Sequence, residues 1–434
     1  MFKEGLLDKI LYKVKKLIPK SVFNFFAPLY HAGLAYAGAV IYGFPSRKMK
    51  VIGVTGTKGK STTVFLIAKI LENSGKKVAA IGSLGFKIKE REWPNTLKMT
   101  MPGRFKLQKF LREARKAGCK YVVLEVTSEG IKQKRHLGIK FDCAVFTNLH
   151  KEHIENHGSF ENYRKAKEEL FRLTPNNHVL NADDASVEHF SKYSADKKIL
   201  FGIKGGDMKA SCIVSGKMGV EFEIYGTMFK TKLFGEFNVY NCLAALSVGA
   251  VYGLDLPAMK PAIERIEEIP GRMQFVQKEP FAVVVDYAHT PDSLESVYKA
   301  LSSPKPQRLI CVLGAAGGGR DKWKRPEFGR IAKKYCDEII LTNEDPYDEN
   351  PLSILKEIES GFSQLPITNY QLPNYEIILD RREAIKKAIN NAETGDTVII
   401  TGKGSETSIA VSGGRRIPWS DAQIVRELID AASR

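Results

Sequence analysis

From about residue 49 onward, short apolar runs alternate with longer segments in which apolar residues recur at helical spacing. The runs that we predict to be buried strands are 51–54, 77–82, 121–126 and 143–147. The segments with helical spacing are 105–117, 160–172 and 240–252. Near-continuous apolar strands joined by helices are typical of a mainly parallel sheet with both faces covered. Residues 210–233 alternate apolar and polar positions instead, which predicts a short antiparallel patch.

A second α/β pattern begins after residues 269–272, whose Ile-Pro-Gly-Arg sequence predicts a hinge. Its predicted buried strands are 282–286, 309–313, 338–342 and 397–401. Helical segments lie between them, so we expect a separate Rossmann-like domain. The expected organisation is an apolar and basic N-terminal segment (1–48), a central domain with a mainly parallel sheet (49–268) and a C-terminal Rossmann-like α/β domain (269–434).

The N-terminal segment allows two interpretations. Residues 2–18 place apolar side chains on one helix face and most lysines elsewhere, and residues 21–46 contain no Asp, Glu, Lys or Arg. Such a stretch is long enough to enter a bilayer, and a basic amphipathic helix before it is typical of an interfacial helix. Pro28 and His31 interrupt any clean span, so we favour helices that pack on the protein body, with a peripheral membrane contact as the alternative.

Composition limits the partners. A formal charge of +17 suits anionic ligands or a membrane surface, but the basic residues are scattered and no RNA- or DNA-binding motif occurs, so we expect no nucleic-acid partner. The six cysteines form no C-x-x-C pair, which argues against a zinc site and favours buried thiols in a reducing compartment. No signal peptide is evident, and we expect a cytoplasmic protein.

The strongest local motif follows the first predicted strand. Residues 56–61 read Gly-Thr-x-Gly-Lys-Ser and are followed by a helical segment, the arrangement that cradles phosphates. Val54 stands where the strict motif has Gly. Lys60 would supply a point charge and Ser61 a hydroxyl for Mg²⁺; a glycine-rich turn that binds nothing is the alternative.

Other polar residues follow strand ends, where open α/β sheets bind their ligands. Glu125 ends one strand, and residues 146–158 end another and contain His153. An acid and a histidine near a phosphate loop are reasonable metal ligands, although Mg²⁺ prefers oxygen and His153 alone could be a surface residue. Lys167, judged alone, is an ordinary helix lysine beside glutamates.

These features occur in an order that resembles the Mur ligase family, and in particular its members that add the third peptide residue to the peptidoglycan precursor. The matching motifs run from about residue 50 to the C-terminus. They are 56–62, 125–128, 146–158, 163–171, 181–184, 235–241, 270–273, 285–292, 320–326 and 402–406. The run Asp-Tyr-Ala-His-Thr-Pro at 286–291 is the most specific of them.

The resemblance implies roles for residues of this chain. Catalytic residues would be Lys60, His153 and Lys167. Nucleotide contacts would come from Gly56, Thr57, Lys58, Gly59, Lys60, Ser61, Thr62, Asn238, Asn241, Arg272, Asp286 and His289. Metal ligands would be Ser61, Glu125, His153 and Lys167, the last as a carbamate. Contacts to the nucleotide-sugar peptide and the amino acid would come from Thr100, Gln133, Arg135, Arg320, Asp345, Tyr347, Gly402 and Glu406.

The implied cofactors are ATP and Mg²⁺, and the implied reaction is carboxylate activation. The carboxylate of a UDP-MurNAc-dipeptide-like acceptor would attack the γ-phosphate, and a free amino acid would then displace phosphate from the acyl phosphate. Two alternatives remain: a ligase of the same superfamily that acts on another peptide or polyamino acid (cyanophycin-like or polyglutamate-adding), and a non-catalytic ATP-binding scaffold. We expect a monomer.

The sequence departs from the family at several points. Lys58, Glu129 and Ser405 replace an Asn, a His and a His that are usual there. Residues 344–347 read Glu-Asp-Pro-Tyr where diaminopimelate-adding members have Asp-Asn-Pro-Arg, so we expect a diamino acid such as lysine. The segment 1–48 also stands where members carry a domain that binds the uridine end, so uridine recognition is expected to differ.

Overall fold

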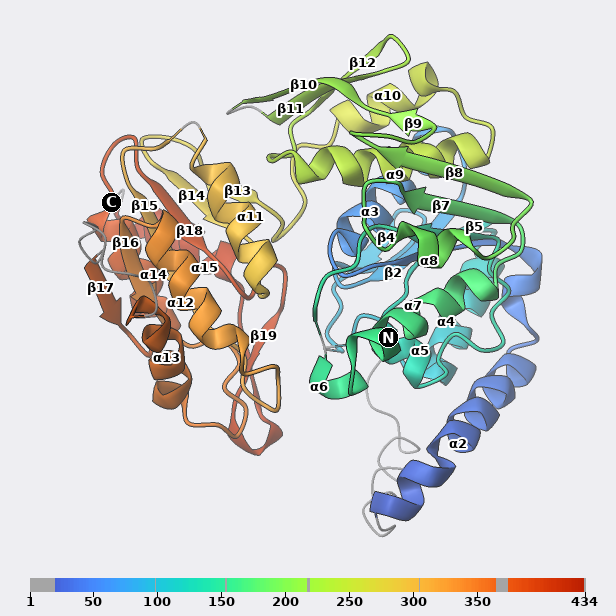
Figure 1. The fold of residues 1–434 in the computed structure, drawn as a ribbon, viewed down its shortest axis with the longest axis horizontal. Helices are drawn as coiled ribbons and strands as arrows, with labels where there is room; N and C mark the ends of the chain where they lie inside the picture. Colours follow the sequence, from blue (N-terminus) through green and yellow to red (C-terminus); the bar gives the residue numbers. More distant parts are fainter. Residues whose placement is uncertain are drawn as a thin grey trace. The chain divides into compact units, whose positions relative to one another are not determined.

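The computed structural model describes residues 20–97, 99–152, 154–216, 219–303, 305–363 and 374–432. The chain forms two compact units, each assembled from separate stretches of sequence (Figure 1). The first unit comprises Met1–His150, Glu161–Lys209 and Tyr240–Ala262. The second comprises Lys151–Phe160, Ala210–Val239 and Ile263–Arg434.

The first unit is built on a nine-stranded sheet in the order β4-β3-β2-β5-β1-β6-β7-β8-β9. Its strands are β1 (Lys50–Thr55), β2 (Val78–Gly82), β3 (Gly85–Ile88), β4 (Arg91–Trp93), β5 (Tyr121–Glu125), β6 (Cys143–Phe146), β7 (Asn177–Asn181), β8 (Lys197–Gly202) and β9 (Met208–Lys209). From β2 to β9 all neighbours pair in parallel, and β3 and β4 add an antiparallel edge. The predicted parallel sheet is therefore confirmed, with β1 at its centre.

Helices cover this sheet. They are α3 (Lys60–Asn73), α4 (Arg104–Lys116), α5 (Ser128–Lys132), α7 (Phe160–Arg172), α8 (Val187–Ser191), α9 (Phe237–Val251) and α10 (Leu256–Glu264). Helix α3 packs on β1, β2 and β5. Gly53 of β1 leaves room for α7, because a Cβ there would lie 2.9 Å from Leu170 Cδ1. The glycine in the middle of the central strand thus lets a helix approach closely.

The second unit contains the antiparallel patch and the Rossmann-like sheet. The patch consists of β10 (Ser211–Gly216), β11 (Gly219–Ile224) and β12 (Thr227–Thr231), as the alternation predicts. The larger sheet has the order β13-β14-β18-β15-β16-β17. Its strands are β13 (Gln274–Gln277), β14 (Ala282–Val285), β15 (Leu309–Leu313), β16 (Glu338–Leu341), β17 (Asn374–Ile377) and β18 (Thr397–Ile400). Only β13 is antiparallel to its neighbour.

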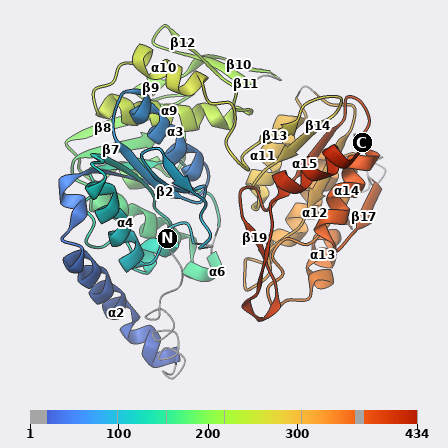
Figure 2. The same cartoon turned by 180° about the vertical axis from the view of Figure 1, so that it is seen from behind.

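Alternate residues of these strands enter two cores, one on each face of the sheet. Helices cover both faces (Figure 2). One core contains α11 (Pro291–Leu301), α12 (Lys324–Tyr335) and α13 (Pro351–Glu359). The other contains α14 (Arg381–Asn391) and α15 (Asp421–Ala432). Cys311 of β15 lies in the first core and Ile310 in the second. This α/β sandwich confirms the predicted fold class.

One cysteine pair was not predicted. Cys311 is joined by a disulfide to Cys336, which caps α12 and lies 25 residues further along the chain. The two meet because β15 and α12 contribute to the same hydrophobic core, which residue spacing does not reveal. Cys119, Cys143 and Cys242 are buried free thiols, as expected. Because of the disulfide, cysteine usage no longer argues for a reducing compartment.

Residues 20–48 form α2 (Lys20–Ile41) and a short 3₁₀ helix, η1 (Pro45–Lys48). Helix α2 packs on α4, as favoured by the sequence analysis, and contains Pro28. Within the described part of the chain, no helix has the length and apolar character needed to cross a membrane. The predicted helix at 2–18 lies outside the described residues.

Candidate active site

The glycine-rich loop joins β1 to α3, and two of its glycines have conformations and neighbours that exclude a side chain. Gly56 has φ +151°, and a Cβ on it would lie 1.9 Å from Thr147 Oγ1. Gly59 has φ +76° and caps α3, where a Cβ would lie 2.3 Å from Asn241 Oδ1. The N-cap residue Gly59 has no side chain that could cap α3, and a helix N-terminus of this kind is where an anion is expected to bind.

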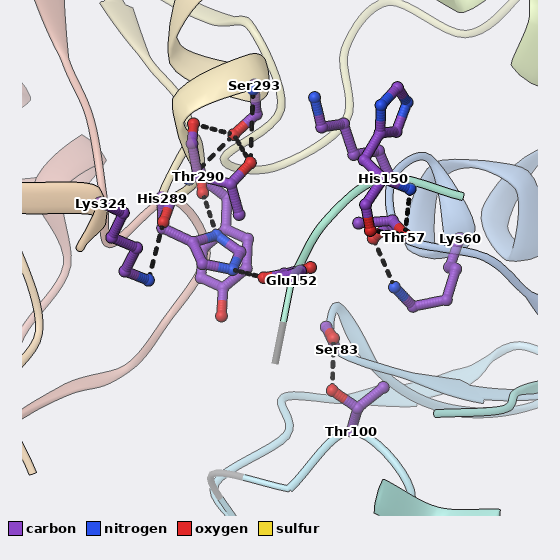
Figure 3. Close-up of polar contacts among 12 residues, drawn as sticks. Thr57, Lys60, Ser83, Thr100, His150, Glu152, His289, Thr290, Ser293 and Lys324 are labelled. Atoms are coloured by element: carbon purple, nitrogen blue, oxygen red, sulfur yellow. Dashed lines mark hydrogen bonds and ion pairs between the residues drawn. The ribbon is translucent and has the colours of Figure 1, made fainter. Parts of the chain in front are cut away.

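The loop is anchored from β6 and carries a cation. Asn148 accepts a hydrogen bond from the Lys58 N–H at 2.8 Å, and its carbonyl accepts one from the Thr57 N–H at 2.9 Å. Lys60 Nζ donates to the Thr57 carbonyl at 2.8 Å (Figure 3). The ammonium is thereby folded back over the loop. To bind a phosphate there, it exchanges its hydrogen bond to the neutral Thr57 carbonyl for one to the phosphate. Ser61 and Thr62 follow in the first turn of α3 and are buried.

A carboxylate lies beside Ser61. Glu125, at the end of β5, is 2% exposed and accepts hydrogen bonds from Ser61 Oγ at 2.9 Å and from the Ser83 N–H at 2.8 Å. Among the described residues, no Lys, Arg or His nitrogen lies within ion-pair distance of it. A buried carboxylate without a protein cation is costly. Two oxygen donors this close are the ligands that Mg²⁺ prefers, so the residues fit that ion.

Helix α7 contributes a buried amine to the same loop. Lys167 is 2% exposed, and its Nζ donates to the Gly56 carbonyl at 2.6 Å. The amine also lies 4.5 Å from the ring centroid of Tyr163, whose hydroxyl is 3.0 Å from Thr57 Oγ1. Lys167 is therefore part of the loop's surroundings and not an exposed helix lysine. His153, predicted as its partner in metal binding, lies outside the described residues.

The residues predicted to contact the nucleotide-sugar peptide form two groups in the first unit. Thr100 Oγ1 lies 2.9 Å from Ser83 Oγ, so Ser83 links Thr100 to Glu125 (Figure 3). Arg135 is 8% exposed and donates to Gln133 Oε1 at 2.7 Å and to a main-chain carbonyl. Gln133 and Arg135 thus lie against each other at the end of α5, where Gln133 also donates to Glu129.

Asn238 and Asn241 lie one turn apart on α9 and are both buried. Asn238 Nδ2 donates to the Phe234 carbonyl at 2.8 Å. Asn241 Oδ1 accepts from Thr63 Oγ1 at 3.4 Å, close to Gly59. Asn241 is therefore held against the phosphate loop, whereas the Asn238 contact is with the chain just before α9.

In the second unit, Asp286 anchors the turn after β14. Its carboxylate accepts hydrogen bonds from the N–H groups of Met273 and Ala288, both at 2.7 Å. Burial raises the pKa of Asp286, while the neighbouring Arg272 guanidinium favours the charged form. The guanidinium lies 4.5 Å from the ring centroid of Tyr287. Arg272, Asp286 and Tyr287 therefore form one cluster around the predicted hinge.

His289 connects this cluster to two residues that the sequence did not single out. Its Nδ1 lies 2.8 Å from the Tyr287 carbonyl, and its Nε2 lies 3.4 Å from Glu152 Oε1 (Figure 3). Lys324 Nζ donates to the His289 carbonyl at 3.2 Å. Burial lowers the pKa of Lys324, and Glu152 opposes that shift. Glu152 lies in segment 146–158, which matches a family motif, and this match was the sequence signal that could have identified it.

The predicted amino-acid pocket also lies in the second unit and centres on Lys403. This fully buried lysine donates to Asp345 Oδ1 at 2.8 Å and to Glu406 Oε2 at 2.5 Å. Asp345 also accepts the Ala410 N–H at 2.6 Å. Burial lowers the pKa of Lys403, but Glu406 and Asp345 outweigh burial and raise it overall. Asp345 is thus committed to an internal ion pair.

Glu344 is the acid of this pocket that keeps an unused oxygen. It is 6% exposed, and its Oε2 has no hydrogen-bond partner among the described residues. Gly402 has φ +103°, and a Cβ on it would lie 2.5 Å from that oxygen. Tyr347 packs over Gly318 and hydrogen-bonds Arg320. The absence of a side chain at Gly402 therefore leaves room for the Glu344 carboxylate.

The structure thus collects the predicted residues into separate groups in the two units. In the first, the loop residues 56–62 lie with Glu125, Lys167 and Asn241. In the second, Arg272, Asp286 and His289 form one cluster, and Arg320, Asp345, Tyr347, Gly402 and Glu406 surround another. Residues that belong to these groups but were not predicted are Ser83, Asn148, Glu152, Tyr163, Lys324, Glu344 and Lys403.

Two family models match the chain: the Mur ligase middle domain over residues 54–249, and the glutamate ligase domain of Mur ligases over residues 271–404. A UDP-N-acetylmuramoyl-L-alanyl-D-glutamate–2,6-diaminopimelate ligase of Syntrophomonas wolfei is 38% identical over 408 residues, which are 92% of this chain and 82% of that protein. A UDP-N-acetylmuramyl-tripeptide synthetase of a Roseiflexus species is 36% identical over 428 residues, 93% of this chain and 82% of that protein.

Solved structures agree. That of a UDP-N-acetylmuramoyl-L-alanyl-D-glutamate–2,6-diaminopimelate ligase has a TM-score of 0.62 at 31% identity and covers 89% of this chain and 79% of its own. A folylpolyglutamate synthase of Mycobacterium tuberculosis, complexed with ADP and AMPPCP, shares the fold with a TM-score of 0.69 at 17% identity, covering 86% and 92%. The chain belongs to the Mur ligase family, which confirms the resemblance. It is an enzyme of the ATP-dependent, peptide-forming ligase class.

Proposed function

We propose that the chain uses ATP to join a free amino acid to a UDP-MurNAc-dipeptide-like peptidoglycan precursor. The observation that carries this proposal is the buried Glu125–Ser61 pair next to a helix N-terminus that is open to phosphates. The acceptor carboxylate attacks the γ-phosphate, which forms the acyl phosphate and releases ADP. The amino group then attacks the acyl carbon, the C–O bond to phosphate breaks, and an amide remains.

This chain's own residues have distinct roles in that reaction. Lys60 and the first N–H groups of α3 bind and orient the triphosphate. Ser61 and Glu125 would hold Mg²⁺, which supplies charge neutralisation at the phosphates when bound. Lys167 is proposed to act as a carbamate, which would turn the amine beside the Gly56 carbonyl into an anionic oxygen ligand. His153 is proposed as a further ligand.

The test is amino-acid-dependent ADP release with the nucleotide-sugar dipeptide, ATP and Mg²⁺, followed by mass spectrometry of the product. Lys60→Met should abolish release. Lys69→Met, on the outer part of the same helix and 35% exposed, is the matched control and should not change it. No amino-acid-dependent release would favour the scaffold alternative, and ligation only to another peptide would favour the sister ligases.

We propose a diamino acid with a distal amine, such as lysine, as the amino acid. Tyr347 stands where the diaminopimelate-adding pattern has the Arg that binds a distal carboxylate. Glu344 has a buried oxygen that lacks a donor, and an ammonium group would provide one. Against this proposal, several similar relatives are named diaminopimelate ligases.

Two substitutions separate lysine from diaminopimelate. Glu344→Gln should lower kcat/KM for lysine by about tenfold or more, because a hydrogen bond to a charged group is lost. Tyr347→Arg should raise the use of diaminopimelate relative to lysine. Tyr375→Arg, at a 43% exposed tyrosine of the same unit, is the control and should change neither. A wild-type preference for diaminopimelate would refute the lysine proposal and leave the ligase proposal intact.

The remaining expectations are also proposals. We propose that the enzyme acts in the cytoplasm as a monomer. The predicted division at residues 48 and 268 is proposed as the functional one, with the N-terminal segment, the ATP-binding domain and the C-terminal domain as its parts.

A further inference from the structure

Helix α2 has one face that packs on its own unit and is made of small residues. Ala35 and Ala39 are 1% and 0% exposed, and a Cβ on Gly38 would lie 3.6 Å from Phe105 of α4. A Cβ on Gly138 would lie 2.6 Å from the Ala39 Cβ. The helix therefore approaches its neighbours closely along this face, which fixes which side points away from the unit.

The opposite face is apolar and exposed. Six of the fourteen exposed large apolar side chains of the described residues belong to α2. They are Phe26 (54%), Leu29 (73%), Tyr30 (37%), Tyr36 (51%), Val40 (63%) and Ile41 (60%). Leu29, Tyr36 and Val40 are spaced by seven and four residues and lie on one stripe, with Gly33 between them in open space. In Figures 1 and 2, the N-terminal half of α2 projects from the rest of its unit.

Basic side chains lie near the C-terminal end of this apolar face. Residues 21–46 carry no charged side chain, but Arg47 and Lys48 follow directly and are exposed. Helix α4, on which α2 packs, exposes Lys109, Arg112, Arg115 and Lys116, and Arg112 Nη1 reaches the Ile41 carbonyl at 3.4 Å. These exposed basic residues of η1 and α4 form a basic border. An apolar stripe beside a basic border is complementary to an anionic lipid surface.

We propose that α2 docks this face onto an anionic phospholipid bilayer as an interfacial helix that lies in the membrane surface. The stripe enters the acyl boundary, its tyrosines lie at headgroup level, and the basic border binds lipid phosphates. This surface is outside the phosphate loop and the amino-acid pocket. The proposal therefore stands whether or not the proposed substrate is correct.

The test is co-sedimentation of the full chain with vesicles of phosphatidylcholine alone and of phosphatidylcholine with phosphatidylglycerol. We expect binding to the anionic vesicles, weakened by salt, and far less to the neutral ones. The double substitution Leu29→Glu and Val40→Glu should reduce binding by about tenfold for each side chain removed from the membrane. The matched control is Leu352→Glu with Ile417→Glu, two apolar residues that are 40% and 50% exposed elsewhere, and it should bind like wild type.

Other outcomes overturn the proposal. Equal binding of wild type and the α2 variant would show that this face is not the docking surface. No wild-type binding, together with concentration-dependent dimers that the α2 variant abolishes in analytical ultracentrifugation, would assign the face to a second copy of the chain. Circular dichroism and ADP release should match wild type in every variant, which separates a lost surface from a lost fold.

Discussion

The charge state of Glu125 leads to the sharpest prediction. This carboxylate is 2% exposed, and its two described hydrogen bonds come from the Ser61 hydroxyl and the Ser83 N–H at 2.9 and 2.8 Å. Since no basic residue of the described chain pairs with it, its charge is uncompensated until a cation binds. Burying a charge in this way destabilises the free protein, and the same cost is recovered when Mg²⁺ arrives.

Glu125→Gln should therefore have opposite effects on the free and the ligand-bound protein. The amide keeps the size and an acceptor oxygen, so without Mg²⁺ we expect unchanged stability or a gain of about 1 kcal/mol. Wild type with Mg²⁺ and nucleotide at about 100 times Kd should gain about 2.7 kcal/mol. For a unit of this size, that gain corresponds to a rise in Tm of about 5–10 °C.

Scanning fluorimetry with and without Mg²⁺ and ADP measures both effects. The Gln variant should lose most of the Mg²⁺-dependent rise in Tm, and its ADP release should fall by about 100-fold or more, since loss of even an outer-shell partner costs 10–100-fold. Glu90→Gln, an exposed residue of the same unit, controls for net charge. A Gln variant that keeps the full Mg²⁺-dependent rise would refute the assignment of Glu125 as a ligand.

Three other changes test the stability of the fold. Replacing Cys311 and Cys336 by Ser should lower the free energy of unfolding by about 3 kcal/mol in urea melts, because the disulfide joins residues 25 apart; an unchanged midpoint would contradict this. Arg381→Met should lower the free energy of unfolding by about 3–5 kcal/mol, because the fully buried Asp421 loses its ion pair, and adding Asp421→Leu should recover part of that loss. A double variant no more stable than the single one would contradict the stabilising role of this ion pair. Burial lowers the pKa of His136 from 6.5 to about 4, so the unfolded chain binds the proton more strongly than the folded one. The free energy of unfolding should therefore fall by up to about 3 kcal/mol as the pH drops from 6.5 towards 4. His136→Phe should remove that part of the pH dependence in melts at several pH values.

The strand pattern predicted that Glu125 ends a buried strand. Residues 51–54 and 121–126 were predicted as buried parallel strands, and the structure pairs Val54 with Glu125. In a parallel sheet, the residue that ends one strand lies beside the loop that follows its neighbour. Hydrophobic patterning therefore predicted that the phosphate loop and the acid lie at the same edge of the sheet, and the observed pairing of β1 with β5 brings them together.

The groups that hold these residues in place did not follow from the pattern. Ser83 reaches Glu125 only because β2 and β5 pair, and nothing in the residues around it marks its N–H as a donor. The Cys311–Cys336 disulfide likewise depends on a helix and a strand that share one core. Sequence periodicity predicts which face of an element is buried, but not which element lies against it.

In the amino-acid pocket, a contact that the sequence does not reveal changes the argument about which amino acid is bound. From the sequence, Asp345 appeared as an acid in place of an amide, and hence as a ligand for a distal amine. The structure pairs Asp345 with Lys403, which lies 58 residues further along the chain and also binds Glu406. A carboxylate committed to a buried lysine has little attraction left for a substrate ammonium. The argument for a distal amine therefore rests on Glu344, whose buried Oε2 still lacks a donor, and it is Glu344→Gln rather than a change at Asp345 that decides it.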